Sequence, residues 1–220
     1  MKLARLHHFA NTEPYWHVHL AVLLAVALQL GLNDKLSVGP KYVIAFFEIL
    51  LVVALAITVK RGHRVILHLR RAMAITLIAL ISIANIASLT LVIDELFSLK
   101  QISGKELIIS GLSIYITNII IFGLWYWELD SGGSQQQSID VGQIDFLFPQ
   151  MTAKEGVSQL DDWNPTFFDY LYVSITNASA FSPTDTMPLT HRAKALMGLQ
   201  STVSIITVAL VAARAVNILA

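Results

Sequence analysis

The chain has 220 residues, of which 55% are hydrophobic and only 14% are charged. Soluble domains carry about 25% charged residues, so this composition excludes an ordinary soluble enzyme and indicates a membrane protein. The formal net charge is zero, which gives no support to a nucleic-acid partner or an acidic solvating tail. Cysteine is absent, which excludes disulfide frameworks, thiolate metal sites and cysteine nucleophiles.

Five apolar segments are long enough to cross a bilayer, which takes roughly 20 mostly apolar helical residues. No small-residue cleavage site follows the first of them, so we interpret it as a span and not as a signal peptide. The fold class predicted is therefore all-α, a multi-pass cell-membrane protein in a lipid bilayer with about five transmembrane helices. The segments are 17–33, 42–59, 72–93, 107–127 and 194–216.

The long connection between the last two spans consists of two different parts. Residues 131–143 are rich in Gly, Ser and Gln and predict a flexible loop. Residues 163–181 begin with capping residues (Asp161, Asp162 or Asn164) and Pro165, followed by about three apolar turns. A helix of this length is too short to span, so we predict one short re-entrant or interfacial helix that starts near Asn164.

Residues 169–190 read DYLYVSITNASAFSPTDTMPLT and resemble the pore helix and filter of potassium-channel pore modules, commonly YFSFVTLTTVGYGDIVPLT. The flanking residues 122–133 and 197–216 are similar to the outer and inner helices of that module, and the chain is also similar to uncharacterised bacterial inner-membrane pore-loop proteins. The resemblance implies an N-terminal region with three spans, 1–100, and a pore-loop module, 105–220. That module would contain an outer helix (107–127), a polar loop (128–162), a re-entrant helix and loop (163–190) and an inner helix (191–219).

The filter itself departs from the family at the position of TVGYG, where this chain has Ala180 to Thr184. A potassium filter is a stack of backbone carbonyl rings, and Pro183 fixes φ at about −65° where the family has tyrosine between two glycines. We therefore expect no potassium-selective carbonyl stack. The candidate pore-loop residues are Ser179, Ala180, Phe181, Ser182, Pro183, Thr184 and Asp185.

This loop has two interpretations. The C-terminus of a re-entrant helix carries roughly half a negative charge, and with Asp185 and the hydroxyls of Ser182 and Thr184 it would favour cations. Alternatively, Phe181 fills the centre and the loop is a sealed plug.

Polar residues in the spans also allow two interpretations. Gln200, Ser204 and Thr207 share one helical face and are candidate pore-lining residues, although such residues equally join helices to one another. For Ser110, Ser113 and Thr117, and for Ser82, Asn85 and Ser88, we favour packing. The histidines His7, His8, His17 and His19 have no carboxylate at ligand spacing, so we predict interfacial side chains, no metal and no other cofactor.

Glu48 lies about seven residues inside the second span, where a carboxylate is costly without a partner. Crossing counts put it on the same membrane side as Arg214, and we predict an intramembrane ion pair between them, direct or through water. The alternatives are a protonated Glu48, or an Arg214 paired with Asp94 or Glu95.

Two indications of orientation disagree. The positive-inside rule favours a cytoplasmic N-terminus, because the membrane side of the N-terminus would hold seven basic residues and the opposite short loops four. The seven are Lys2, Arg5, Lys60, Arg61, Arg64, Arg70 and Arg71, and the four are Lys35, Lys41, Lys100 and Lys105. Five crossings then place the 128–193 connection in the cytoplasm, whereas a pore module would have it outside. We favour the pore-module orientation because the linear match is long.

We expect an ion-channel-like protein that is not selective for potassium, assembled as a homo-oligomer and as a tetramer if it conducts inorganic ions. The alternative is a non-conducting scaffold or regulatory subunit that retains the pore-module fold. An enzyme is not expected, since no paired His/Glu, Ser/Lys or Asp/Asp motif lies inside the spans.

Overall fold

The computed structural model describes residues 16–37, 41–58, 64–98, 103–130, 144–152, 163–180 and 185–219, and these are predominantly helical. The predicted all-α fold class is confirmed. In chain order the elements are α1 (Trp16–Leu30), the 3-10 helix η1 (Asp34–Leu36), α2 (Lys41–Thr58), α3 (Arg64–Ser98), α4 (Gly104–Asp130), β1 (Phe146–Leu147), α5 (Pro149–Thr152), α6 (Phe167–Ala180), β2 (Met187–Pro188) and α7 (His191–Leu219).

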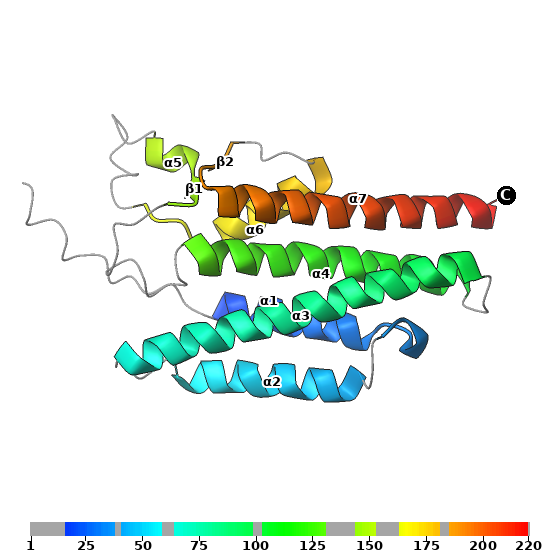
Figure 1. Cartoon of the computed structure of the whole chain (residues 1–220), viewed down its shortest axis with the longest axis horizontal. Helices are drawn as coiled ribbons and strands as arrows, with labels where there is room; N and C mark the ends of the chain where they lie inside the picture. Colours follow the sequence, from blue (N-terminus) through cyan, green and yellow to red (C-terminus); the bar gives the residue numbers. More distant parts are fainter. Residues whose placement is uncertain are drawn as a thin grey trace, which may run out of the picture.

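Five of these helices, α1, α2, α3, α4 and α7, run along the long axis of the molecule, and α4 lies at the centre (Figure 1). α4 packs against α7, α6, α3 and α1, whereas α2 packs only on α1 and α3 among the closely contacting elements. α2 and α7 therefore form opposite edges of the bundle (Figure 1). A glycine allows one of the central contacts: a Cβ added to Gly111 of α4 would lie 2.4 Å from Cγ2 of Val211 on α7.

Three of the helices are long and apolar enough to cross a membrane, namely His68–Leu96, Gly104–Asp130 and His191–Val216. α1 and α2 are shorter apolar helices, about 22 Å and 27 Å long at 1.5 Å per residue. The structure thus establishes three candidate spans, and a count of five goes beyond it.

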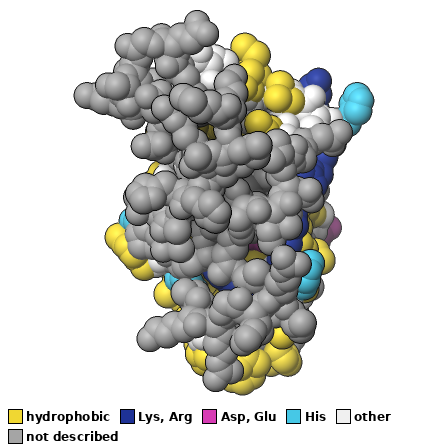
Figure 2. Space-filling view, turned by 90° about the vertical axis from the view of Figure 1, so that its left-hand side faces the viewer, with side chains coloured by type: hydrophobic (Ala, Val, Ile, Leu, Met, Phe, Trp, Pro, Cys, Tyr) yellow, Lys and Arg dark blue, Asp and Glu magenta, His cyan; other side chains and the backbone are white. Residues whose placement is uncertain are grey.

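The surface fits a lipid environment. Large hydrophobic side chains are exposed along the helices, Tyr42, Phe46 and Ile83 being 73%, 62% and 66% exposed. Exposed large hydrophobic side chains in this number are typical of a surface that contacts a membrane or a partner protein. At the end of the bundle where α3 begins and α4 ends, Lys, Arg and His side chains reach the surface (Figure 2).

α6 starts at Phe167, so the predicted start near Asn164 is wrong by three residues. The reason is a capping arrangement: Thr166 donates from its backbone N–H and its hydroxyl to Oδ2 of Asp169, at 2.7 and 2.8 Å. Asp161 and Asp162 lie outside the described residues.

The predicted polar loop 128–162 contains structure that the composition does not indicate. β1 pairs antiparallel with β2, with Phe146 opposite Pro188 and Leu147 opposite Met187, and α5 follows β1 directly. Residues 131–143 and 153–162 lie outside the described residues. The strand pair joins the segment after α4 to the segment before α7.

Candidate functional site

The distinctive feature of the fold is the half-length helix α6, which has 14 residues. It begins at the end of the bundle where α4 ends and stops part of the way along α7, after which the chain returns to β2 at the starting end (Figure 1). α6 packs on both α4 and α7. Its backbone approaches α4 closely, since a Cβ on Gly123 would lie 3.2 Å from Cα of Leu171.

The ends of the candidate pore loop are described. Ser179 is exposed in the last turn of α6, and its hydroxyl donates to the carbonyl of Ile175 at 2.7 Å. Asp185 is exposed two residues before β2 and therefore lies toward the end of the bundle, away from its middle. Residues 181–184, which include Phe181 of the plug interpretation, lie outside the described residues.

A buried polar network holds α6 between its two neighbours. Gln200 of α7 accepts hydrogen bonds at Oε1 from the Tyr126 hydroxyl of α4 (2.5 Å) and from Nδ2 of Asn177 on α6 (2.8 Å). Its Nε2 donates to the hydroxyl and carbonyl oxygens of Ser174, at 2.7 and 2.9 Å. Ser174 in turn donates to the carbonyl of Ile119 at 2.6 Å. We call Tyr126, Ser174, Asn177 and Gln200 the core polar network.

The candidate pore-lining residues Gln200, Ser204 and Thr207 are 0%, 0% and 1% exposed. Ser204 accepts from Nδ2 of Asn118 on α4 at 3.0 Å, and Thr207 donates to the carbonyl of Val203 on its own helix at 2.7 Å. All three side chains are therefore buried within one chain. Gln200 and Ser204 bond to neighbouring helices, which is the contact between helices given as the alternative.

The packing interpretation of the third span is confirmed for two residues. Ser82 of α3 accepts a hydrogen bond from Nε1 of Trp125 on α4 at 3.0 Å. Asn85 donates to the carbonyl of Ile114 at 3.3 Å. Both bonds join α3 to α4.

A second polar cluster closes the end of the bundle from which α6 enters, and we call it the end clamp: Asp130, Asp145, Tyr170, Thr190 and Arg192. Tyr170 donates to Oδ2 of Asp130 at 2.7 Å, and the backbone N–H of Asp145 donates to Oδ1 at 2.5 Å. Asp145 accepts from Nε of Arg192 at 2.9 Å and from the hydroxyl of Thr190. These bonds tie the end of α4, the start of α6 and the start of α7 to β1.

Among the described residues, Glu48 and Arg214 form no direct ion pair. Both carboxylate oxygens of Glu48 and Nε of Arg214 are buried without a hydrogen-bond partner, and no salt bridge joins the two among the described residues. The reason is the packing order, because α2 and α7 lie at opposite edges of the bundle (Figure 1). Oε1 of Glu95, an alternative partner of Arg214, is also without a hydrogen bond.

The imidazole ring of His17 packs against neighbouring aromatic side chains. It stacks edge-on against Phe168 of α6 with ring centroids 4.8 Å apart, and lies beside Trp16. Within the described ranges no group of three or more His, Asp or Glu side chains is arranged to hold a metal ion. His7 and His8 lie outside those ranges.

Sequence reasoning missed Tyr126 and Asn177, which bond α6 to its neighbours, and Asp145 and Arg192 of the end clamp. One signal was present: Asp145 stands in the apolar run Ile144 to Phe148, where an acidic residue needs a specific partner. No protein family, curated protein or solved structure matches this chain.

Proposed function

We propose that this chain is an ion-channel-like membrane protein in which α1, α2, α3, α4 and α7 cross the bilayer and α6 enters it as a re-entrant helix. The observation that carries the proposal is the path of the chain around α6. It enters from one end of the bundle, stops part of the way along, and returns to β2 at that same end (Figure 1).

Assembly into a homo-oligomer follows from the position of the tip of α6. At membrane depth, non-helical backbone is tolerated only where protein or a water-filled cavity covers it. α6 exposes one side made of Phe168, Tyr172, Ile175 and Ser179, and its last carbonyls point toward the middle of the bundle. A neighbouring subunit would cover this face, with four subunits around one axis in a conducting form.

The charge near the loop favours cations. The C-terminus of α6 carries roughly half a negative charge, and Asp185 is exposed on the returning segment. Since Pro183 and the missing glycines disfavour a carbonyl stack, permeating ions would keep much of their water. Sodium and potassium would therefore pass with little discrimination.

The second candidate is a non-conducting scaffold or regulatory subunit. The burial of Gln200, Ser204 and Thr207 favours this candidate, because the polar face of α7 is then packed within the chain and does not line a pore. The exposed face of α7 is mainly apolar, with Leu199, Ile205 and Val208 exposed. Such a face suits lipid or another membrane protein.

The deciding experiment is a flux assay on purified protein in liposomes with sodium, potassium and chloride gradients. The channel proposal expects dissipation of both cation gradients at similar rates, with chloride retained. Strong preference for potassium would contradict the interpretation of residues 180–184. Absence of any flux, together with a stable complex with another membrane protein, would favour the scaffold.

A further inference from the structure

Glu48 is a fully buried carboxyl group without a partner. It is 0% exposed, and neither carboxylate oxygen has a hydrogen bond. It lies on α2 between Ala45 and Val52, which belong to the hydrophobic core that α2 shares with α1 and α3. Glu48 is therefore placed among apolar side chains where the other helices supply no complementary group.

No charged group faces Glu48 from the two helices packed against α2. Residues 20–30 of α1 and 72–93 of α3 contain no Asp, Glu, Lys, Arg or His. The titratable residues described on these helices lie at their ends: His17 and His19 on α1, and His68, Arg70, Arg71, Asp94 and Glu95 on α3. An ionised carboxylate in such surroundings costs several kcal/mol, whereas the neutral acid does not carry that penalty.

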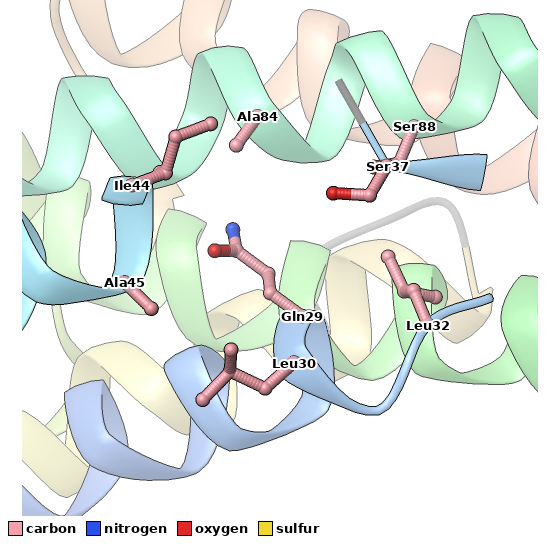
Figure 3. A pocket seen from close by; sticks show the side chains of 8 residues that line it. All are labelled: Gln29, Leu30, Leu32, Ser37, Ile44, Ala45, Ala84 and Ser88. Atoms are coloured by element: carbon pink, nitrogen blue, oxygen red, sulfur yellow. The ribbon is translucent and has the colours of Figure 1, made fainter. Parts of the chain in front are cut away.

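A small cavity lies one helical turn from Glu48. It has a volume of about 20 Å³ and is lined by Gln29 of α1, Leu32 and Ser37 of the connection that follows, Ala45 of α2 and Ser88 of α3 (Figure 3). This is enough for one water molecule, and Ala45 precedes Glu48 by roughly 4.5 Å along the helix axis. Gln29 donates from Nε2 to the carbonyl of Ile81 at 3.1 Å, which leaves its amide oxygen directed toward α2 (Figure 3).

The cavity lies toward one end of the bundle. Leu32 and Ser37 belong to the connection between α1 and α2, at the end opposite to the end clamp (Figure 1). A water molecule held by Gln29, Ser37 and Ser88 would thus stand between that end and the Glu48 side chain.

We propose that Glu48 is a membrane-buried proton-binding site that is loaded and unloaded through this cavity from the end where α1 joins α2. In loading, a hydronium ion in the cavity gives its proton to a carboxylate oxygen; one O–H bond forms, one breaks, and neutral acid and water remain. Unloading is the reverse step. The site is separate from α6 and does not depend on the proposed ion pathway.

The test uses dicyclohexylcarbodiimide, an apolar reagent that adds to a protonated carboxylic acid, on the full chain in lipid vesicles with peptide mass spectrometry. We expect labelling at Glu48 that falls several-fold from acidic to alkaline buffer and is lost in Glu48→Gln. Glu106→Gln, which changes an exposed carboxylate at the start of α4, should leave the labelling unchanged. Absence of the label at Glu48, or labelling independent of pH, would overturn the proposal.

A second measurement keeps the test valid if Glu48→Gln folds poorly. The infrared difference spectrum of the wild-type protein between acidic and alkaline buffer should contain the C=O band of a buried carboxylic acid. Ala84→Leu, which fills the cavity, should slow labelling several-fold. Protection by sodium at constant pH would show a metal-cation site and overturn the assignment to a proton, as would an unchanged rate in Ala84→Leu.

Discussion

Tyr126 on α4 donates a 2.5 Å hydrogen bond to the side-chain oxygen of Gln200 on α7, across 74 positions of the sequence. The same oxygen accepts from Asn177 of α6, so one amide group fixes the relative position of three helices. Both Tyr126 and Gln200 are 0% exposed. The half-length helix is thus held by directional bonds as well as by apolar packing.

Gln200→Leu should destabilise the protein by about 1–3 kcal/mol, because the buried Tyr126 hydroxyl and Asn177 amide would lose their acceptor. The measurement is the thermal unfolding midpoint in mild detergent. Thr202→Val is the matched control on the same helix, since Thr202 is exposed and bonds only to the carbonyl of Gly198 on α7. Equal midpoints for the two variants would contradict the structural role of the network.

Two glycines should respond in opposite directions to alanine. Gly111→Ala places a methyl group 2.4 Å from Cγ2 of Val211, and the resulting shift of α4 against α7 should cost about 1–3 kcal/mol. Gly198→Ala meets nothing within 4 Å and should stabilise α7 by about 0.5–1 kcal/mol. Denaturant unfolding of both variants checks this; a stabilised Gly111→Ala would mean that the two helices are not in close contact.

The absence of cysteine makes single-cysteine variants a clean test of assembly. Ile175→Cys, on the exposed side of α6, should form covalent dimers under mild oxidation or with a short bifunctional reagent in native membranes. Leu50→Cys, on the exposed side of α2, is the control and should remain monomeric. If only the control crosslinks, the subunits meet through α2 and the proposed arrangement around α6 fails.

Asp185→Asn should lower cation flux several-fold if carboxylates from several subunits ring the mouth, since charge in a narrow entrance concentrates counter-ions. The relative rates of sodium and potassium should stay the same, because charge and not ion radius is being changed. Flux in liposomes measures both quantities. Glu106→Gln, a substitution in the first turn of α4, is the control. An unchanged rate would mean that Asp185 serves only the turn before Pro188.

The helices were predictable because hydrophobic length is a strong signal in a chain with so few charges. α1, α2, α3, α4 and α7 overlap the five predicted segments, although α3 extends from Arg64 to Ser98 against a prediction of 72–93. Its extra turns contain Arg70, Arg71, Asp94 and Glu95, which hydropathy assigns to water. At the first of these ends, Arg71 forms an ion pair with Glu128 of α4 at 3.9 Å.

The side-chain network was less predictable because helical periodicity shows which residues share a face and not what that face contacts. Gln200, Ser204 and Thr207 do share one face, yet the face packs on α4 and α6. The direct pairing predicted for Glu48 and Arg214 is absent for a related reason. Both lie toward one end of the bundle, but depth along the axis carries no information about the lateral order of helices, which puts α2 and α7 at opposite edges.

The hydrogen bonds of α6 also impose an order on biosynthesis. A ribosome makes α6 before Met197 and Gln200, whose oxygens accept from Asn177, and before Arg192 of the end clamp. During translation α6 therefore exists for a time without its α7 partners, while α4 is already complete. α6 can therefore reach its final packing only after residues 192–200 of α7 have been made.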